Sequence, residues 1–100
     1  MDRISQEGER MRFEESENVE FKKIVTEDIK KEVIAFANGL GGVIYVGVSD
    51  DGDVQGLEHP DQVMQQLANM IRDSIKPDVT LFIRFVVEDA AGQRFVAVHV

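Results

Sequence analysis

Hydrophobic and polar residues follow two different periods along the chain, and these periods predict strands and helices in succession. Residues 19–24 and 79–88 alternate apolar and polar side chains, as strands with one buried face do. Residues 43–48 form a continuous apolar run rich in Val, which is typical of a strand buried on both faces. Apolar residues from Ile29 to Leu40 recur instead at helical spacing and give one apolar face. The pattern therefore predicts a protein that contains both helices and strands.

Turn-forming and helix-ending residues mark where these segments stop. The Asp-Gly pair at 51–52 lies between apolar runs and is a hairpin signal, so a returning strand is predicted over residues 54–57. Pro60 is expected in the first turn of a second helix that ends before Pro77. Residues 93–100 alternate again and predict the last strand.

The predicted order of elements is β-α-β-β-α-β-β, which indicates an α+β fold with two helices packed on one mixed sheet of about five strands. Thr26 is expected to cap the first helix and Gly39 to end it. Residues 1–14 mix charges of both signs without apolar periodicity, so a loosely ordered or helical leader is expected before a domain at 15–100. The chain ends inside an apolar alternation, at Val100, and we expect the natural protein to continue.

Composition narrows the class of protein. The 100 residues suit one domain with a modest core, since 43% of them are hydrophobic. Cysteine is absent, which excludes disulfides, thiolate metal sites and a cysteine nucleophile. No apolar segment has the length of a signal-peptide core or a membrane span, so we expect a cytoplasmic protein without a membrane partner.

The net charge of -8 argues against nucleic-acid binding, because nucleic-acid-binding domains usually carry a basic excess. Binding needs only a local basic face, however. The densest group of basic residues is Lys22, Lys23, Lys30 and Lys31, which makes these lysines the candidate phosphate-binding face. The alternative interpretation is a solvated surface of mixed charge, in which Glu27 supports Lys31 across one helical turn.

Three segments, in order and at close spacing, carry a resemblance to a known family. They read ESENVEFK at 15–22, VIAFANGLGG at 33–42 and VIYVGVSDDG at 43–52, and VQGL at 54–57 closes the last of them. Together they resemble the Schlafen AlbA-type (AlbA_2) domain family, which is found in bacterial and archaeal regulators and in the vertebrate Schlafen proteins. The resemblance is dense up to Leu57 and thinner from there to the end of the chain.

The resemblance implies an α+β fold and DNA binding, often in transcriptional regulators, and part of the family has been described as ATP-binding. In the vertebrate branch it implies a metal-dependent RNase, whose three carboxylates would fall on Glu15, Glu20 and Asp50 and would bind Mg²⁺ or Mn²⁺. Gly39 stands where the family often has Thr or Ser. Ser49 stands where the family often has Asp, which leaves one fewer carboxylate at the strand end.

The three carboxylates have two interpretations. A divalent metal with oxygen ligands requires acidic groups that converge on one point. Glu15 and Glu20 are five apart and would lie on opposite faces of one regular strand, so they converge only if Glu15 lies in a turn before it. Asp50, at the end of the neighbouring strand, could approach them. The alternative is three solvated acids in an acid-rich chain.

The glycine-rich segment at 39–42 is where successive backbone amides could bind a phosphate. It follows a helix and precedes a strand, which is the reverse of the order in phosphate-binding loops. No Gly-Lys-Ser/Thr motif follows it. We therefore expect a helix stop with tight entry into the buried strand, and this expectation argues against ATP as a ligand.

Three apolar residues, Phe82, Val86 and Phe95, fall on the strand faces opposite the main apolar stripe. Cover by the same chain is expected there, and a partner surface is the alternative. A homodimer through the sheet edge or through the Phe82–Phe95 face is one hypothesis for that partner.

These observations favour a nucleic-acid-binding domain, with DNA preferred over RNA as the partner and no cofactor. Two other functions stay open. One is a Mg²⁺- or Mn²⁺-dependent ribonuclease that uses Glu15, Glu20 and Asp50. The other is a dimerisation or signal-relay module.

Overall fold

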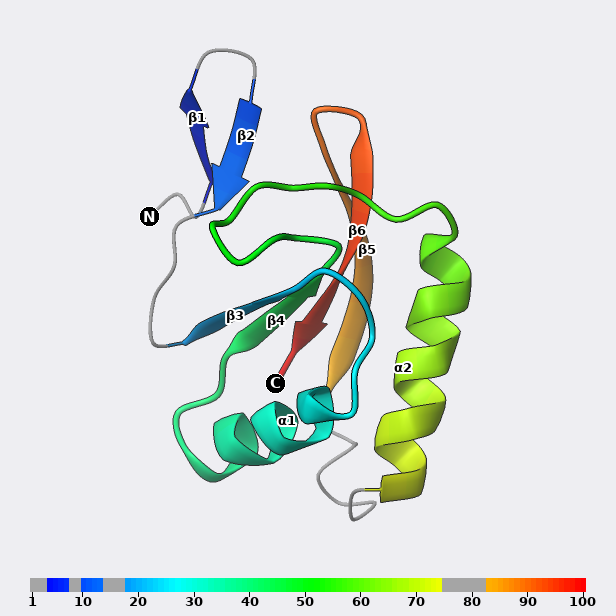
Figure 1. Cartoon of the computed structure of the whole chain (residues 1–100). Coiled ribbons are helices and arrows are strands. Elements are labelled where there is room, and N and C mark those ends of the chain that lie inside the picture. Colours follow the sequence, from blue (N-terminus) through cyan, green and yellow to red (C-terminus); the bar gives the residue numbers. More distant parts are fainter. Residues whose placement is uncertain (1–3, 8–9, 14–17, 75–82) are drawn as a thin grey trace.

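A single mixed sheet forms the centre of the protein. The computed structural model describes residues 4–7, 10–13, 18–74 and 83–100. Within them, four strands form the sheet in the order β3-β4-β6-β5 (Figure 1). Parallel pairing joins the first two of these strands, and the other pairs are antiparallel. The strands are β3 (Val19–Lys22), β4 (Val43–Val46), β5 (Arg84–Ala90) and β6 (Gln93–His99).

The two described helices, α1 (Asp28–Asn38) and α2 (Pro60–Ser74), pack on one face of this sheet. They are amphipathic, and their apolar stripes bury side chains against alternate residues of the strands, which is how a helix and a sheet share a core. The most deeply buried members of this shared cluster are Ile29, Val33, Ile44, Val46, Leu67, Ile71, Val96 and Val98. The predicted α+β fold with two helices on a mixed sheet is therefore confirmed.

A second apolar cluster lies on the other face of the sheet. Its buried members are Val19, Phe21, Val43, Tyr45, Val48, Ala90, Phe95 and Ala97. The ring of Phe95 meets Tyr45 edge to face with centroids 5.8 Å apart, and Phe95 is only 1% exposed. The expected cover by the same chain is confirmed for Phe95, whereas Phe82 lies outside the described residues. A partner surface that uses Phe95 is therefore not available on this face.

The returning strand predicted over residues 54–57 is absent, and this part of the prediction was wrong. One isolated bridge pairs Val48 with Val54, and the ladder stops there. The amides of Gln55 and Gly56 then both donate to the carbonyl of Gly47, at 2.9 and 3.0 Å. Two donors on one acceptor do not continue a strand ladder. Within the described residues the sheet accordingly has four strands rather than about five.

The N-terminal segment also differs from its prediction. Instead of a loosely ordered or helical leader, β1 (Ile4–Glu7) and β2 (Arg10–Phe13) pair as an antiparallel two-stranded sheet. The register places Ile4 opposite Phe13. Alternation at residues 11–13 is the sequence signal for this strand, but three residues are too few to separate a strand from a charged coil.

The two described helices begin and end at residues that the sequence predicts in part. Pro60 begins α2 and Gly39 follows α1, as predicted. The expected cap at Thr26 was wrong: α1 begins at Asp28 after Glu27, which makes no capping hydrogen bond through its side chain. The Thr26 carbonyl instead accepts the amide of Ile29 at 3.2 Å. Neither described helix is long and apolar enough to cross a membrane.

Candidate nucleic-acid interface

The predicted basic face divides between the end of β3 and the helix that follows it. Lys22 is the last residue of β3, Lys23 comes directly after it, and Lys30 and Lys31 lie on α1. Parallel pairing of β3 with β4 requires this helical crossover, because parallel strands cannot be joined by a tight turn. The chain therefore presents its densest lysines on two adjacent elements.

Lys22 is held in an ion pair that crosses from the sheet to α1. Its Nζ lies 2.8 Å from Oε1 of Glu32, and the two side chains are only 21% and 22% exposed. Hydrogen bonding to the Glu32 carboxylate raises the pKa of Lys22 above its usual value, although burial of the ammonium opposes this effect. Lys22 is thus a cation whose charge is already balanced by a neighbour.

Lys30 also has an acidic partner. Its ammonium pairs with the carboxylate of Glu27, three residues earlier and directly before α1. The Glu27 side chain is 79% exposed, so this pair is solvated and contributes little to stability. The helical turn thus joins Glu27 to Lys30, not to Lys31 as the sequence spacing suggested.

Lys23 and Lys31 differ from the other two lysines. Both side chains are exposed, and neither forms an ion pair with a described residue. The four lysines consequently do not make one uniform basic surface. Two of them are neutralised by adjacent acids, and two remain able to meet a phosphate at no cost in protein contacts.

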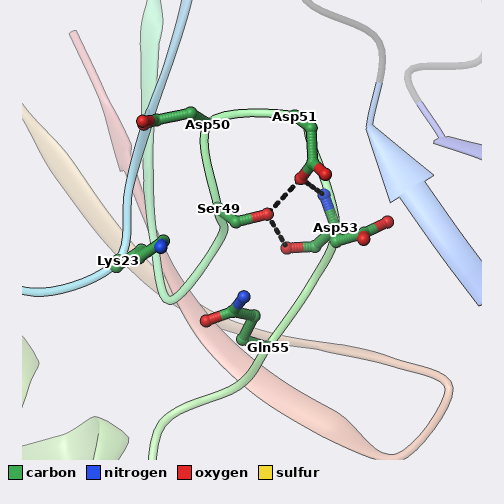
Figure 2. Close-up of a pocket in the computed structure, with 6 residues that line it drawn as sticks. All are labelled: Lys23, Ser49, Asp50, Asp51, Asp53 and Gln55. Atoms are coloured by element: carbon green, nitrogen blue, oxygen red, sulfur yellow. Dashed lines mark hydrogen bonds between the residues drawn. The ribbon is translucent and has the colours of Figure 1, made fainter.

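Beside Lys23 there is an open pocket of about 310 Å³ (Figure 2). It lies where β3 and β4 end, so the parallel register brings its two walls together. One wall is Lys23, and the opposite wall is the loop that follows β4. All of its lining side chains are polar or charged: Lys23, Ser49, Asp50, Asp51, Asp53 and Gln55.

The loop wall of this pocket is a closed turn. The Ser49 amide donates to the Asp53 carbonyl at 2.9 Å, and the Gly52 amide donates to the Ser49 carbonyl at 2.9 Å. The buried Ser49 hydroxyl donates to the Asp51 carboxylate, which also accepts the Asp53 amide at 3.3 Å. Gly52 adopts a φ of 90°, a conformation that favours glycine. Ser49 and Asp51 therefore hold the turn in shape.

The three predicted carboxylates are only partly described by the structure, because Glu15 lies outside the described residues. Glu20 is exposed on β3, between Val19 and Phe21, whose side chains are buried on the opposite face. Asp50 lies beyond the end of β4 and lines the pocket, whereas Glu20 does not. Among residues 18–74 and 83–100, no three Asp, Glu or His side chains gather as metal ligands. A metal site is thus not formed by the carboxylates that are described.

The glycine segment after α1 uses its amides within the protein. Gly39 and Gly41 donate to the Phe36 carbonyl at 3.2 and 2.9 Å, and Gly42 donates to the Val100 carbonyl at 3.2 Å. A Cβ at Gly42 would lie 2.7 Å from the Phe36 ring and 2.8 Å from the Asn18 carbonyl oxygen. The expected helix stop is confirmed, and these three amides are not oriented to bind an anion.

Sequence reasoning identified Lys23 and Asp50 but missed the pocket between them. Ser49, Asp51, Asp53 and Gln55 stand in a segment that carries part of the family resemblance, and its signal for local structure was the Asp-Gly pair. That signal predicts a turn, but it does not predict which residue from β3 the turn will face. The pocket depends on the parallel register, in which Lys22 stands opposite Val46.

Comparisons with known proteins agree with this fold. The family model described as Schlafen, AlbA_2 matches residues 15–100. No curated protein matches the chain. Among solved structures, the DIP2311 protein from Corynebacterium diphtheriae is similar, with a TM-score of 0.64 at 24% identity. The match covers 89% of this chain and 21% of that chain. A likeness at this identity shows the fold alone.

Proposed function

This chain belongs to the Schlafen AlbA_2 family, and on that premise we propose that it is a nucleic-acid-binding domain of a transcriptional-regulator-like protein, with DNA as its partner. The observation that supports this proposal is two exposed cations, Lys23 directly after β3 and Lys31 in the first turn of α1. Neither Lys23 nor Lys31 forms an ion pair with a described residue. Phosphate contact requires such charges on a reachable surface.

The neighbouring lysines extend this contact face. The ion pair of Lys30 with Glu27 is solvated, so Lys30 can exchange the carboxylate for a phosphate at a cost of about 0–1 kcal/mol. Lys22 is less able to do so, because its pair with Glu32 is largely buried. The contact face is therefore centred on Lys23 and Lys31, with Lys30 as a third contributor.

The net charge of -8 limits how strongly the domain binds. Acidic side chains elsewhere repel the phosphate backbone over a range set by the Debye length, which is about 8 Å at physiological salt. The repulsion slows encounter but does not remove a short-range contact. We therefore expect moderate affinity that falls steeply as salt increases.

A titration of the chain with labelled oligonucleotides tests this proposal. Single- and double-stranded DNA and RNA of the same sequence are each measured at two salt concentrations, with and without Mn²⁺. Saturable binding that weakens at the higher salt supports the proposal. Absence of binding to all four polymers at low salt contradicts it, and cleavage that requires Mn²⁺ supports the ribonuclease instead.

A homodimer is a further part of this proposal. In the described four-stranded sheet, β3 and β5 are the edge strands, and edge strands present unpaired backbone groups. Pairing of β5 with its counterpart in a second copy is the dimer contact we propose, since Phe95 is buried and contributes no surface. Sedimentation at increasing concentration tests it, and a monomer throughout that range removes the dimer without affecting nucleic-acid binding.

A further inference from the structure

We propose that the pocket beside Lys23 receives one unpaired nucleobase and that its lining favours guanine. The inference rests on the proposed nucleic-acid binding. When the lysines bind a phosphate of the strand, the base next to that phosphate would enter the pocket. Lys23 belongs both to the contact face and to the pocket, so a strand that meets the first lies next to the second.

Three side chains of the pocket have hydrogen-bonding groups with no partner among the described residues. They are Lys23, Asp50 and Gln55, and all three are exposed. Asp51, by contrast, accepts hydrogen bonds from Ser49 and from the Asp53 amide. Figure 2 shows the Asp50 carboxylate turned away from Ser49, so it takes no part in the hydrogen bonds that close the turn. The pocket thus offers both donors and acceptors to a ligand.

The charge of the lining selects a base over a phosphate. The carboxylates of Asp50, Asp51 and Asp53 outnumber the single ammonium of Lys23, so the interior of the pocket disfavours an anion, whereas the exposed ammonium of Lys23 can still meet a phosphate from outside the pocket. A base edge is neutral and carries N–H groups, which a carboxylate accepts. The volume of about 310 Å³ stands at the low end for ligand sites, and it suits one base rather than a longer group.

The hydrogen-bonding groups of guanine match a pocket that offers one ammonium as donor and one carboxylate as acceptor. Its N1–H and N2–H₂ groups are adjacent donors, so one carboxylate such as Asp50 can accept both. Its O6 accepts a hydrogen bond from a lysine, here Lys23. Thymine and uracil present carbonyl oxygens on either side of one N–H, and these oxygens repel a carboxylate. The Watson–Crick edge is buried in a duplex, so the base must be unpaired.

Oligonucleotides that differ at one position test this inference. We would measure binding of a labelled single-stranded oligo-dT and of the same strand with one central guanine, hypoxanthine, adenine or cytosine. The guanine strand is expected to bind about 10-fold more tightly than oligo-dT, within the range for one bidentate base contact. Hypoxanthine lacks the N2 amine and should lose most of this gain.

Two variants assign the preference to the pocket. Asp50→Asn turns one carboxylate oxygen into a donor, so it is expected to lose the guanine preference while binding oligo-dT at least as well. Asp73→Asn makes the same chemical change at an exposed residue in the last turn of α2 and should keep the preference. An Asp50→Asn variant that weakens binding to both strands equally would overturn the inference.

The two proposals fail in different ways. Salt-dependent binding with equal affinity for guanine and oligo-dT strands overturns the guanine pocket and leaves the proposed function standing. If no oligonucleotide binds, the proposed function fails. Titration with guanosine and with uridine then tests whether the pocket binds a base. A shift of the Gln55 side-chain amide NMR resonance on addition of guanosine, but not on addition of uridine, supports a base site. The absence of a shift with either nucleoside overturns it.

Discussion

The ammonium of Lys22 lies 2.8 Å from Oε1 of Glu32, and this ion pair joins the last residue of β3 to the middle of α1. It fixes the helix across the end of the strand, where Lys23 and the pocket begin. Oε2 of Glu32 is buried without a partner among the described residues, so Lys22 supplies the ion pair that this carboxylate makes through Oε1. The pair is therefore expected to stabilise the fold rather than to bind a ligand.

Lys22→Met is expected to destabilise the protein by about 1–3 kcal/mol, because it leaves the Glu32 carboxylate partly buried without a cation. Urea unfolding of the wild type and the variant measures this change. The double variant with Glu32→Met removes both charges and should recover part of the loss. Losses that simply add in the double variant would mean that the two residues do not interact in solution.

The stability of the wild type should also depend on pH above the usual pKa of Lys22. The folded pKa is raised above the usual value of 10.5, so the ion pair contributes fully below that value and its contribution is lost as pH rises through the folded pKa. The difference in unfolding free energy between the wild type and Lys22→Met should therefore shrink above about pH 10.5. A difference that stays constant across this range would contradict the raised pKa, and the comparison with the variant cancels the effects of all other groups that the two proteins share.

Gly42→Ala is expected to cost about 1–3 kcal/mol of stability, because its Cβ would overlap the Phe36 ring and the Asn18 carbonyl. The matched control is Gly39→Ala, whose Cβ would meet nothing nearer than 3.4 Å. Thermal or urea unfolding of both variants measures the difference. If the two substitutions were equally mild, the glycine segment would not be the tight contact that the structure describes.

Ser49→Ala should open the turn that forms one wall of the pocket. The buried hydroxyl donates to the Asp51 carboxylate, and its loss removes a charge-assisted hydrogen bond worth about 1.5–3 kcal/mol. Hydrogen exchange at the amides of Gly52 and Asp53 is expected to speed up more than exchange in β6. Ser49→Thr keeps the hydroxyl and should retain slow exchange, whereas unchanged exchange in the alanine variant would remove Ser49 from this role.

Periodicity predicted the parts of the fold in which burial decides the conformation. The continuous apolar run at 43–48 became the buried strand β4, and the helical spacing before Gly39 became α1. Prediction failed where hydrogen bonds decide instead. The Gly47 carbonyl accepts two amides, and the pairing stops at the bridge of Val54. The pattern of apolar residues does not predict this arrangement of hydrogen bonds.

The candidate site was less predictable than the fold, because one of its ion pairs joins residues from two different elements. The Glu27–Lys30 contact lies within one helical turn and can be anticipated from spacing. The Lys22–Glu32 contact depends on how α1 crosses the end of β3, which the sequence alone does not determine. Four lysines close together in the sequence therefore became two paired and two available cations.

The central claim is that Lys23 and Lys31 contact phosphate, and reversing their charges tests it most directly. The salt dependence of single-stranded DNA binding would be measured for Lys23→Glu/Lys31→Glu and for Arg84→Glu, an exposed cation on the opposite edge strand β5. Removing two phosphate contacts should weaken binding at low salt at least about 10-fold and flatten the log–log slope by roughly 1.4 to 2, while Arg84→Glu leaves the slope unchanged. Equal slopes in the wild type and the double variant would contradict the account.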